Sequence, residues 1–255
     1  MLFLNKYNMG FENLVNRLEK EGKFRDFDRD ITLIEKERGT PYTNTLKYLL
    51  SVTNELEENG VSDDYALIGG YGVLTHLANS FGRKIIPNWR TSHDLDIVTK
   101  NFGIKSVIDG SYEIESRGRS HSIPGKYTYL IKDPKIETPC ELDLYIPIYD
   151  NTCNSEYEDS QLVKINNRVF GKEFFERSEK KDFYGVNISV PSLKDLISLK
   201  LDIGKETRKK DIQDLRDLVA IANIEEINLN KELSENQIKV LYKDILINSV
   251  NRKKL

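Results

Sequence analysis

Residues Tyr65 to Lys100 read YALIGGYGVLTHLANSFGRKIIPNWRTSHDLDIVTK, and this stretch decides the fold. It opens with a short apolar run that ends in Gly69-Gly70. Apolar residues at helical spacing follow, and a polar loop then leads to a second strand pattern, Asp94 to Val98. The stretch therefore predicts two neighbouring strands with a helix between them in the sequence.

Two carboxylates lie on one face of the second strand. Side chains alternate along a strand, so Asp94 and Asp96 point to one side while Leu95 and Ile97 point to the other. Two carboxylates side by side repel each other, and an enclosed site needs a cation to compensate them. Mg²⁺ prefers hard oxygen ligands and often also holds the phosphates of a nucleotide. The pair therefore predicts a divalent-metal site for Mg²⁺ or Mn²⁺.

The paired glycines suit a phosphate-binding turn. Glycine lets backbone N–H groups approach a phosphate closely, and the helix N-terminus that follows Gly69-Gly70 favours anions. A lone D-x-D is a weak signal, because charged strand edges are common. The alternative interpretation is a solvated strand edge after a tight turn, and the ordered combination of glycines, helix and D-x-D favours the nucleotide site.

The ordered set of Gly69-Gly70, a helix and Arg90-x-Ser92-x-Asp94-Leu95-Asp96 resembles the nucleotidyltransferase fold, and within it the AbiEii-type toxins of toxin–antitoxin systems. The resemblance implies an α+β fold with a mixed β-sheet core flanked by helices, an N-terminal helical region and a C-terminal helical half. It makes Asp94 and Asp96 catalytic metal ligands. The nucleotide-binding positions that it implies are Gly69, Gly70, Arg90 and Ser92. Arg90 is alternatively a structural partner of Asp94.

A third carboxylate is expected on a later strand. Strand patterns cover Tyr112–Ser116, Lys126–Ile131 and Cys140–Ile146, and the last of these carries Glu141 and Asp143 on one face. In many nucleotidyltransferases a carboxylate on a strand beside the D-x-D pair completes the metal site. The resemblance gives this catalytic, metal-binding role to Asp143, with Glu141 as its competitor. A solvated strand edge is the alternative.

The resemblance also covers Pro191–Leu218, where a lysine in an apolar helix precedes a basic cluster and D-x-x-D-L. It implies catalytic roles for Lys200 and Asp211, and Lys200 would also bind the nucleotide by neutralising triphosphate charge. On one straight helix these two residues share a face roughly 16 Å apart, too far for an ion pair. Either they contact different parts of the bound substrates, or Gly204 interrupts the helix and folds them together. For Asp211, the alternative is a solvated i,i+3 partner on a charged helix.

The chain has 255 residues, which fits one large domain or two small ones. We expect an N-terminal helical region that packs on the core over 1–60, a nucleotidyltransferase core over 61–190 and a C-terminal helical region over 191–255. The net charge of -3 gives no global attraction to nucleic acid, so RNA binding needs a local basic patch. The candidate patch residues are Lys205, Arg208, Lys209 and Lys210, with Arg168 and Lys181 as additions. Nearby acidic residues offset these charges, so the alternative of an ordinary solvated helix is favoured here.

Composition predicts a cytoplasmic protein without membrane contact. No apolar run approaches ~18 residues, the length of a membrane span, and the apolar run at the N-terminus is too short for a signal peptide. Cys140 and Cys153 have neither a metal-site spacing nor a disulfide framework. His93 points away from Asp94 along the strand, so we expect it to be packed or bridging rather than a general base.

The resemblance implies an NTP-dependent nucleotidyltransferase that moves an NMP to an acceptor hydroxyl, with Mg²⁺ or Mn²⁺ as cofactor. In AbiEii-type toxins the acceptor is the 3′ end of tRNA, so the expected partners are an NTP, tRNA and a cognate antitoxin. The run Gly69 to Val73 also resembles the opening of lincosamide and aminoglycoside nucleotidyltransferases, which makes an antibiotic the first alternative acceptor. A catalytically silent fold that serves as a binding module is the second alternative, and the intact D-x-D argues against it.

Overall fold

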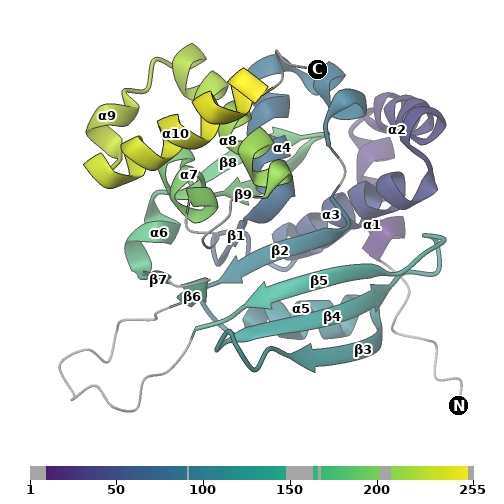
Figure 1. Cartoon of the computed structure of the whole chain (residues 1–255). Helices are drawn as coiled ribbons and strands as arrows, with labels where there is room; N and C mark the ends of the chain where they lie inside the picture. Colours follow the sequence, from purple (N-terminus) through teal and green to yellow (C-terminus); the bar gives the residue numbers. More distant parts are fainter. Residues whose placement is uncertain (1–9, 91, 148–162, 166–167, 202–207, 252–255) are drawn as a thin grey trace, which may run out of the picture.

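The computed structural model describes residues 10–90, 92–147, 163–165, 168–201 and 208–251. Cys153, Gly204 and Lys205 lie outside these residues, and so does the side chain of Arg168. The centre of the protein is a five-stranded sheet with the strand order β1-β2-β5-β4-β3 (Figure 1). Its strands are β1 (Tyr65–Leu67), β2 (Asp94–Thr99), β3 (Glu113–Arg119), β4 (Lys126–Lys132) and β5 (Cys140–Tyr145).

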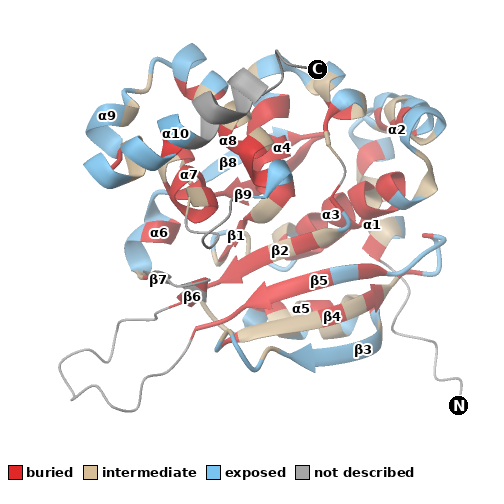
Figure 2. Ribbon diagram, in the orientation of Figure 1, coloured by how far each residue is buried: buried red, intermediate tan, exposed pale blue. Residues whose placement is uncertain are grey.

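The sheet is mixed, because β2 and β5 run parallel while every other neighbouring pair is antiparallel. The central strand β2 alternates as its sequence predicts: Leu95 and Ile97 are fully buried, and Asp94 and Asp96 on the opposite face are half-buried. The edge strand β3 is almost entirely exposed (Figure 2). The buried layer of the sheet therefore lies at β1, β2 and β5, where the carboxylates are.

Helices flank this sheet. The N-terminal ones are α1 (Gly10–Lys20), α2 (Phe24–Arg38) and α3 (Thr40–Glu58), and almost every residue of α3 from Tyr42 to Leu56 is buried. With α5 (Gly103–Ser111), α3 lies behind the sheet in Figure 1. The helix α4 (Gly69–Phe81) follows β1 directly and packs on β2, and a short 3-10 helix, η1 (Arg83–Asn88), comes next.

The C-terminal half adds two strand pairs and a group of helices. The hairpins are β6 (Val163–Ile165) with β7 (Arg168–Phe170), and β8 (Glu179–Phe183) with β9 (Val186–Val190). The helices are α6 (Lys172–Glu176), α7 (Leu193–Leu201), α8 (Lys209–Ile224), α9 (Leu229–Glu232) and α10 (Glu235–Asn251). The predicted α+β architecture, with a mixed sheet flanked by an N-terminal helical region and a C-terminal helical half, is confirmed.

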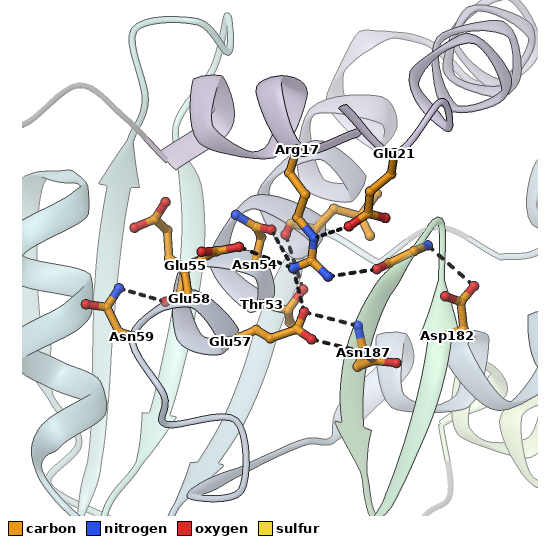
Figure 3. Close-up of polar contacts among 12 residues, drawn as sticks. Arg17, Glu21, Thr53, Asn54, Glu55, Glu57, Glu58, Asn59, Asp182 and Asn187 are labelled. Carbon is orange, nitrogen blue, oxygen red and sulfur yellow. Dashed lines mark hydrogen bonds and ion pairs between the residues drawn. The ribbon is translucent and has the colours of Figure 1, made fainter. Parts of the chain in front are cut away.

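A polar network fastens α1 to the rest of the molecule (Figure 3). The Arg17 guanidinium donates to Glu57 Oε2 at 2.7 Å and to Asn54 Oδ1 at 3.0 Å, both on α3. It also donates to the Gly185 carbonyl oxygen at 3.0 Å, in the β8–β9 turn. Asn187 on β9 donates to the other oxygen of Glu57 at 3.0 Å. One guanidinium thus joins an N-terminal helix, a buried helix and a hairpin.

No helix among the described residues combines the length and the apolar character that crossing a membrane requires.

Candidate active site

The turn from β1 into α4 needs glycine for two separate reasons. Gly69 has a φ of +64°, a left-handed conformation that side chains disfavour. A Cβ on Gly69 would also lie 2.1 Å from Asp96 Oδ2. A Cβ on Gly70 would lie 2.8 Å from Arg90 Nη2 and 2.9 Å from Ser92 Oγ. The two glycines therefore let these polar side chains reach the N-terminus of α4, which no side chain caps.

Three carboxylates meet beside this turn. The parallel pairing of β2 with β5 sets Asp96 opposite Asp143, on the same face of the sheet. Oxygen atoms of Asp94, Asp96 and Asp143 all lie within 4.8 Å of one another. Glu141 is exposed and is not part of this group. Asp143 is only 3% exposed, so the strand-edge alternative is wrong for Asp143 and geometry favours it over Glu141.

The three carboxylates repel one another in the absence of a bound metal ion. Burial, together with the charges of Asp94 and Asp143, raises the pKa of Asp96 to about 7. The Tyr145 hydroxyl lies 3.4 Å from Asp96 Oδ1, a long contact for a hydroxyl donor. Clustered carboxylate oxygens are the donor set that Mg²⁺ and Mn²⁺ accept. The residues therefore fit a divalent ion.

Two residues that the sequence did not single out hold Asp143 from β4. The Lys126 ammonium lies 2.5 Å from Asp143 Oδ2, and the Thr128 hydroxyl donates to Asp143 Oδ1 at 2.6 Å. Both positions fall in a strand that the sequence predicts, and alternation puts them on one face. The sequence alone does not show that β4 pairs with β5, and this pairing sets Thr128 opposite Asp143.

A second network, made of cations and two buried aspartates, faces the carboxylates. Arg90 makes two hydrogen bonds to Asp214, at 2.5 and 2.6 Å. The Lys200 ammonium lies 2.6 Å from Asp214 Oδ2 and 3.4 Å from Asp211 Oδ1, and Arg208 Nε lies 2.5 Å from Asp211 Oδ2. Both aspartates are fully buried. The sequence did not assign a role to Asp214, and the structure pairs Arg90 with it in a two-bond contact.

The network also decides between the two arrangements left open for Lys200 and Asp211. The helix α7 ends at Leu201 and α8 begins at Lys209, so the two residues do not share one helix. The break brings their side chains into contact, as the second alternative requires. Asp211 does have an i,i+3 partner in Arg208, but the expectation that it is solvated is wrong, because Asp211 has no exposed surface.

One open pocket of about 310 Å³ collects most of the predicted site residues. Those that line it are Gly69, Gly70, Arg90, Ser92, Asp94, Asp96, Asp143 and Lys200. Ser92 Oγ donates to Asp94 Oδ1 at 3.0 Å and orients that carboxylate. Asp211 is the exception, since it is buried against Lys200 and does not line the wall.

A neighbouring, more open pocket shares Arg90, Ser92 and Asp94 with the first. His93 lines this second pocket and is exposed, so the expectation that it is packed is wrong. In the candidate basic patch, Arg208, Lys209 and Lys210 are exposed at the start of α8. Lys210 lines both pockets. Lys181 lies on β8, where it pairs with Glu179 at 2.6 Å.

No protein-family model matches this sequence, and no curated protein matches it. A solved structure from H. pylori, described as a "putative nucleotidyltransferase", is similar with a TM-score of 0.37 and 13% sequence identity. The similarity covers 84% of this chain and 96% of that chain. At this level of similarity the function has to be inferred from the site itself.

Proposed function

We propose that the protein is a metal-dependent nucleotidyltransferase that moves an NMP from an NTP to an acceptor hydroxyl. One observation carries the proposal: a single pocket holds three clustered carboxylates, a glycine turn at a helix N-terminus and a buried lysine. Transfer of this kind depends mainly on positioning the phosphates and neutralising their charge. The pocket offers groups for both tasks. The catalytically silent alternative loses support, because the three carboxylates predicted to bind metal all line the pocket.

Asp94, Asp96 and Asp143 would hold Mg²⁺ or Mn²⁺. Such an ion, when bound, supplies positive charge to the phosphate oxygens of the nucleotide. The first turn of α4 at Gly69 and Gly70 would receive a phosphate through backbone N–H groups, because these groups have no intrahelical acceptor.

The cationic network would bind the negative charge of the triphosphate and of the departing pyrophosphate. Lys200 and Arg208 line the pocket, and their buried partner Asp211 holds both in place. In the reaction, the acceptor oxygen bonds to the α-phosphorus and the bond from that phosphorus to the β-phosphate oxygen breaks. Pyrophosphate leaves with the bonding electrons, and the hydroxyl proton passes to a carboxylate of the pocket.

We further propose that the acceptor is the 3′ end of tRNA and that the protein is the toxin of a toxin–antitoxin pair. Support comes from the resemblance of Arg90–Asp96 and Pro191–Leu218 to AbiEii-type toxins. The exposed cations Arg208 and Lys210 line the pocket, and the exposed Lys209 lies between them in the sequence. Contacts to phosphates supply much of the affinity for RNA.

A labelling screen tests the proposal. Wild-type protein is incubated with Mg²⁺, each α-labelled NTP in turn, total tRNA and a panel of antibiotics. We expect label on tRNA with the wild type and none with Asp94→Ala/Asp96→Ala. The control Asp28→Ala/Asp63→Ala removes two exposed carboxylates outside the pocket and should label tRNA like the wild type. Label only on an antibiotic would replace the tRNA acceptor by a small molecule.

A further inference from the structure

Both oxygen atoms of Asp143, the third carboxylate of the pocket, already contact side chains of the protein. Lys126 lies 2.5 Å from one oxygen of Asp143, and the Thr128 hydroxyl donates to the other oxygen at 2.6 Å. The Lys126 side chain is only 20% exposed, so this ion pair is largely shielded from water. A metal ion that binds Asp143 Oδ2 where Lys126 now contacts it would have to displace the Lys126 ammonium.

The protein's own cations already offset part of the negative charge of the carboxylate group. Asp94, Asp96 and Asp143 carry three negative charges when ionised, and Lys126 offsets one of them. Within this group of four side chains two negative charges remain, which equals the charge of one Mg²⁺ ion in magnitude. Four other cations line the pocket, and three of them form ion pairs with the buried aspartates Asp211 and Asp214. These three are Arg90, Lys200 and Arg208, and the fourth is Lys210. Adding a second divalent ion would leave an excess of positive charge beside Lys126, which is unfavourable in a partly buried site.

We propose that Lys126 takes the place of a second divalent ion at Asp143, so that the pocket binds a single metal ion. The inference rests on the proposed metal-dependent function and adds a positioning residue to it. Lys126 comes from β4, one strand beyond the carboxylates, and reaches Asp143 because β4 pairs with β5 beside it. Its ammonium fixes the carboxylate and supplies a positive charge at that position.

Mn²⁺ titration of the full chain, followed by electron paramagnetic resonance, tests this inference without measuring activity. We expect the wild type to bind a single Mn²⁺ ion with an uncoupled spectrum. Lys126→Met removes the ammonium and keeps an unbranched side chain, so a second Mn²⁺ should bind, with magnetic coupling to the first. Lys126→Arg keeps the charge and should bind one ion. Asp143→Asn in the Lys126→Met background should abolish the second site.

Lys132→Met is the matched control, because Lys132 lies on the same strand and pairs with the exposed Glu115 outside the pocket. It should bind one ion. Two coupled ions in the wild type, or a single ion in a folded Lys126→Met protein, would overturn the inference. If Lys126→Met does not fold by circular dichroism, Lys126→Gln replaces it. Wild type that binds no Mn²⁺ beyond the level of Asp94→Asn would instead contradict the metal-dependent function itself.

Discussion

At the scale of single residues, Gly69 shows how closely the Asp96 carboxylate approaches helix α4. Its left-handed backbone and the missing Cβ let Asp96 lie over the first turn of α4. Gly82, at the other end of the same helix, also has a positive φ of 80°, but a Cβ there would meet nothing within 4 Å. Both positions need a backbone with positive φ, whereas only Gly69 also needs the space that a missing Cβ leaves.

Gly69→Ala should therefore cost more than Gly82→Ala. We expect Gly82→Ala to lower the free energy of unfolding by about 2 kcal/mol, because its φ of 80° and ψ of 161° lie in a region that almost only glycine adopts. Gly69→Ala should lower it by about 3 kcal/mol, because Asp96 must also move. Urea denaturation measures both values, and a Mn²⁺ titration should show weaker binding for Gly69→Ala alone. Equal losses with unchanged Mn²⁺ affinity would contradict the close approach of Asp96.

The raised pKa of Asp96 predicts that the free energy of unfolding of the metal-free protein depends on pH. Its pKa in the fold is about 7, above the ordinary 3.8, so the native state holds a proton that the unfolded state releases. Ionisation of this carboxylate therefore costs stability as pH rises from about 4 to 7, and the cost stays constant above that range. Asp96→Asn cannot ionise and should be more stable than the wild type by about 2 kcal/mol at pH 8.

The advantage of Asp96→Asn should shrink at pH 5. Urea denaturation in the presence of a chelator measures it at both pH values, and Asp28→Asn, at an exposed position, is the control with no expected change. An Asp96→Asn protein that is less stable than the wild type at pH 8 would show that the carboxylate is not under electrostatic strain.

At the scale of elements, the break between α7 and α8 creates the cationic half of the site. It lets Lys200 from the first helix contact Asp211 and Asp214 from the second in a buried ion-pair network. Removing one partner of a buried ion pair leaves the other charge uncompensated, which costs much more than losing an exposed pair. The stability of the two helices therefore depends on these aspartates.

Asp211→Asn should lower the free energy of unfolding by about 3 kcal/mol, because Lys200 and Arg208 lose a shared carboxylate. The matched control is Glu235→Gln, which breaks the exposed i,i+4 pair with Lys239 on α10 and should cost no more than about 0.5 kcal/mol. Chemical denaturation of the two variants side by side measures the difference. Similar small losses would mean that the buried network does not hold α7 on α8.

The elements also show what sequence can and cannot predict. The strands that carry Asp94 and Asp143 were predicted from alternation and punctuation, and the helix after Gly69-Gly70 from its apolar spacing. The helix α5 was not predicted, because its sequence GIKSVIDGS offers few apolar positions and two glycines. The strand β8 (EKKDF) was not predicted either, since charged residues hide its pattern. Hydrogen bonds to β9 form it, and local sequence does not encode them.

In the same way, a site residue could be predicted where the spacing within one strand determines which face its side chain lies on. Asp94 and Asp96 share a face by alternation alone. The contacts of Lys126 and Thr128 with Asp143 depend on the register between two strands, and the contacts of Asp214 depend on the angle between two helices. Register and packing angle are tertiary properties, which explains why the sequence assigned these residues no role.

At the scale of the whole molecule, the Arg17 network joins α1 to the rest of the protein at a place apart from the pocket. Arg17 lines a separate surface depression with Lys20, Glu21, Glu57 and Glu58, and none of these residues lines the carboxylate pocket. Stability and metal binding should therefore be separable here.

Arg17→Met should lower the free energy of unfolding by about 2 kcal/mol, because Glu57 and the Gly185 carbonyl lose a charged donor that links three elements. Its affinity for Mn²⁺ should equal that of the wild type. Lys20→Met, at an exposed position on the same helix, is the control and should be neutral. A loss of Mn²⁺ binding in folded Arg17→Met protein would show that the N-terminal helices shape the pocket after all.

The central claim is that the pocket transfers a nucleotidyl group, and the position of the transferred label tests it most directly. The same NTP is supplied in two forms, labelled at the α- or the γ-phosphate, with Mg²⁺ and total tRNA. We predict that tRNA acquires the α-label and not the γ-label, and that Asp94→Ala/Asp96→Ala protein transfers neither. Transfer of the γ-label would make the protein a kinase. Absence of both labels from tRNA and from every antibiotic in the panel, with every NTP, would contradict the account.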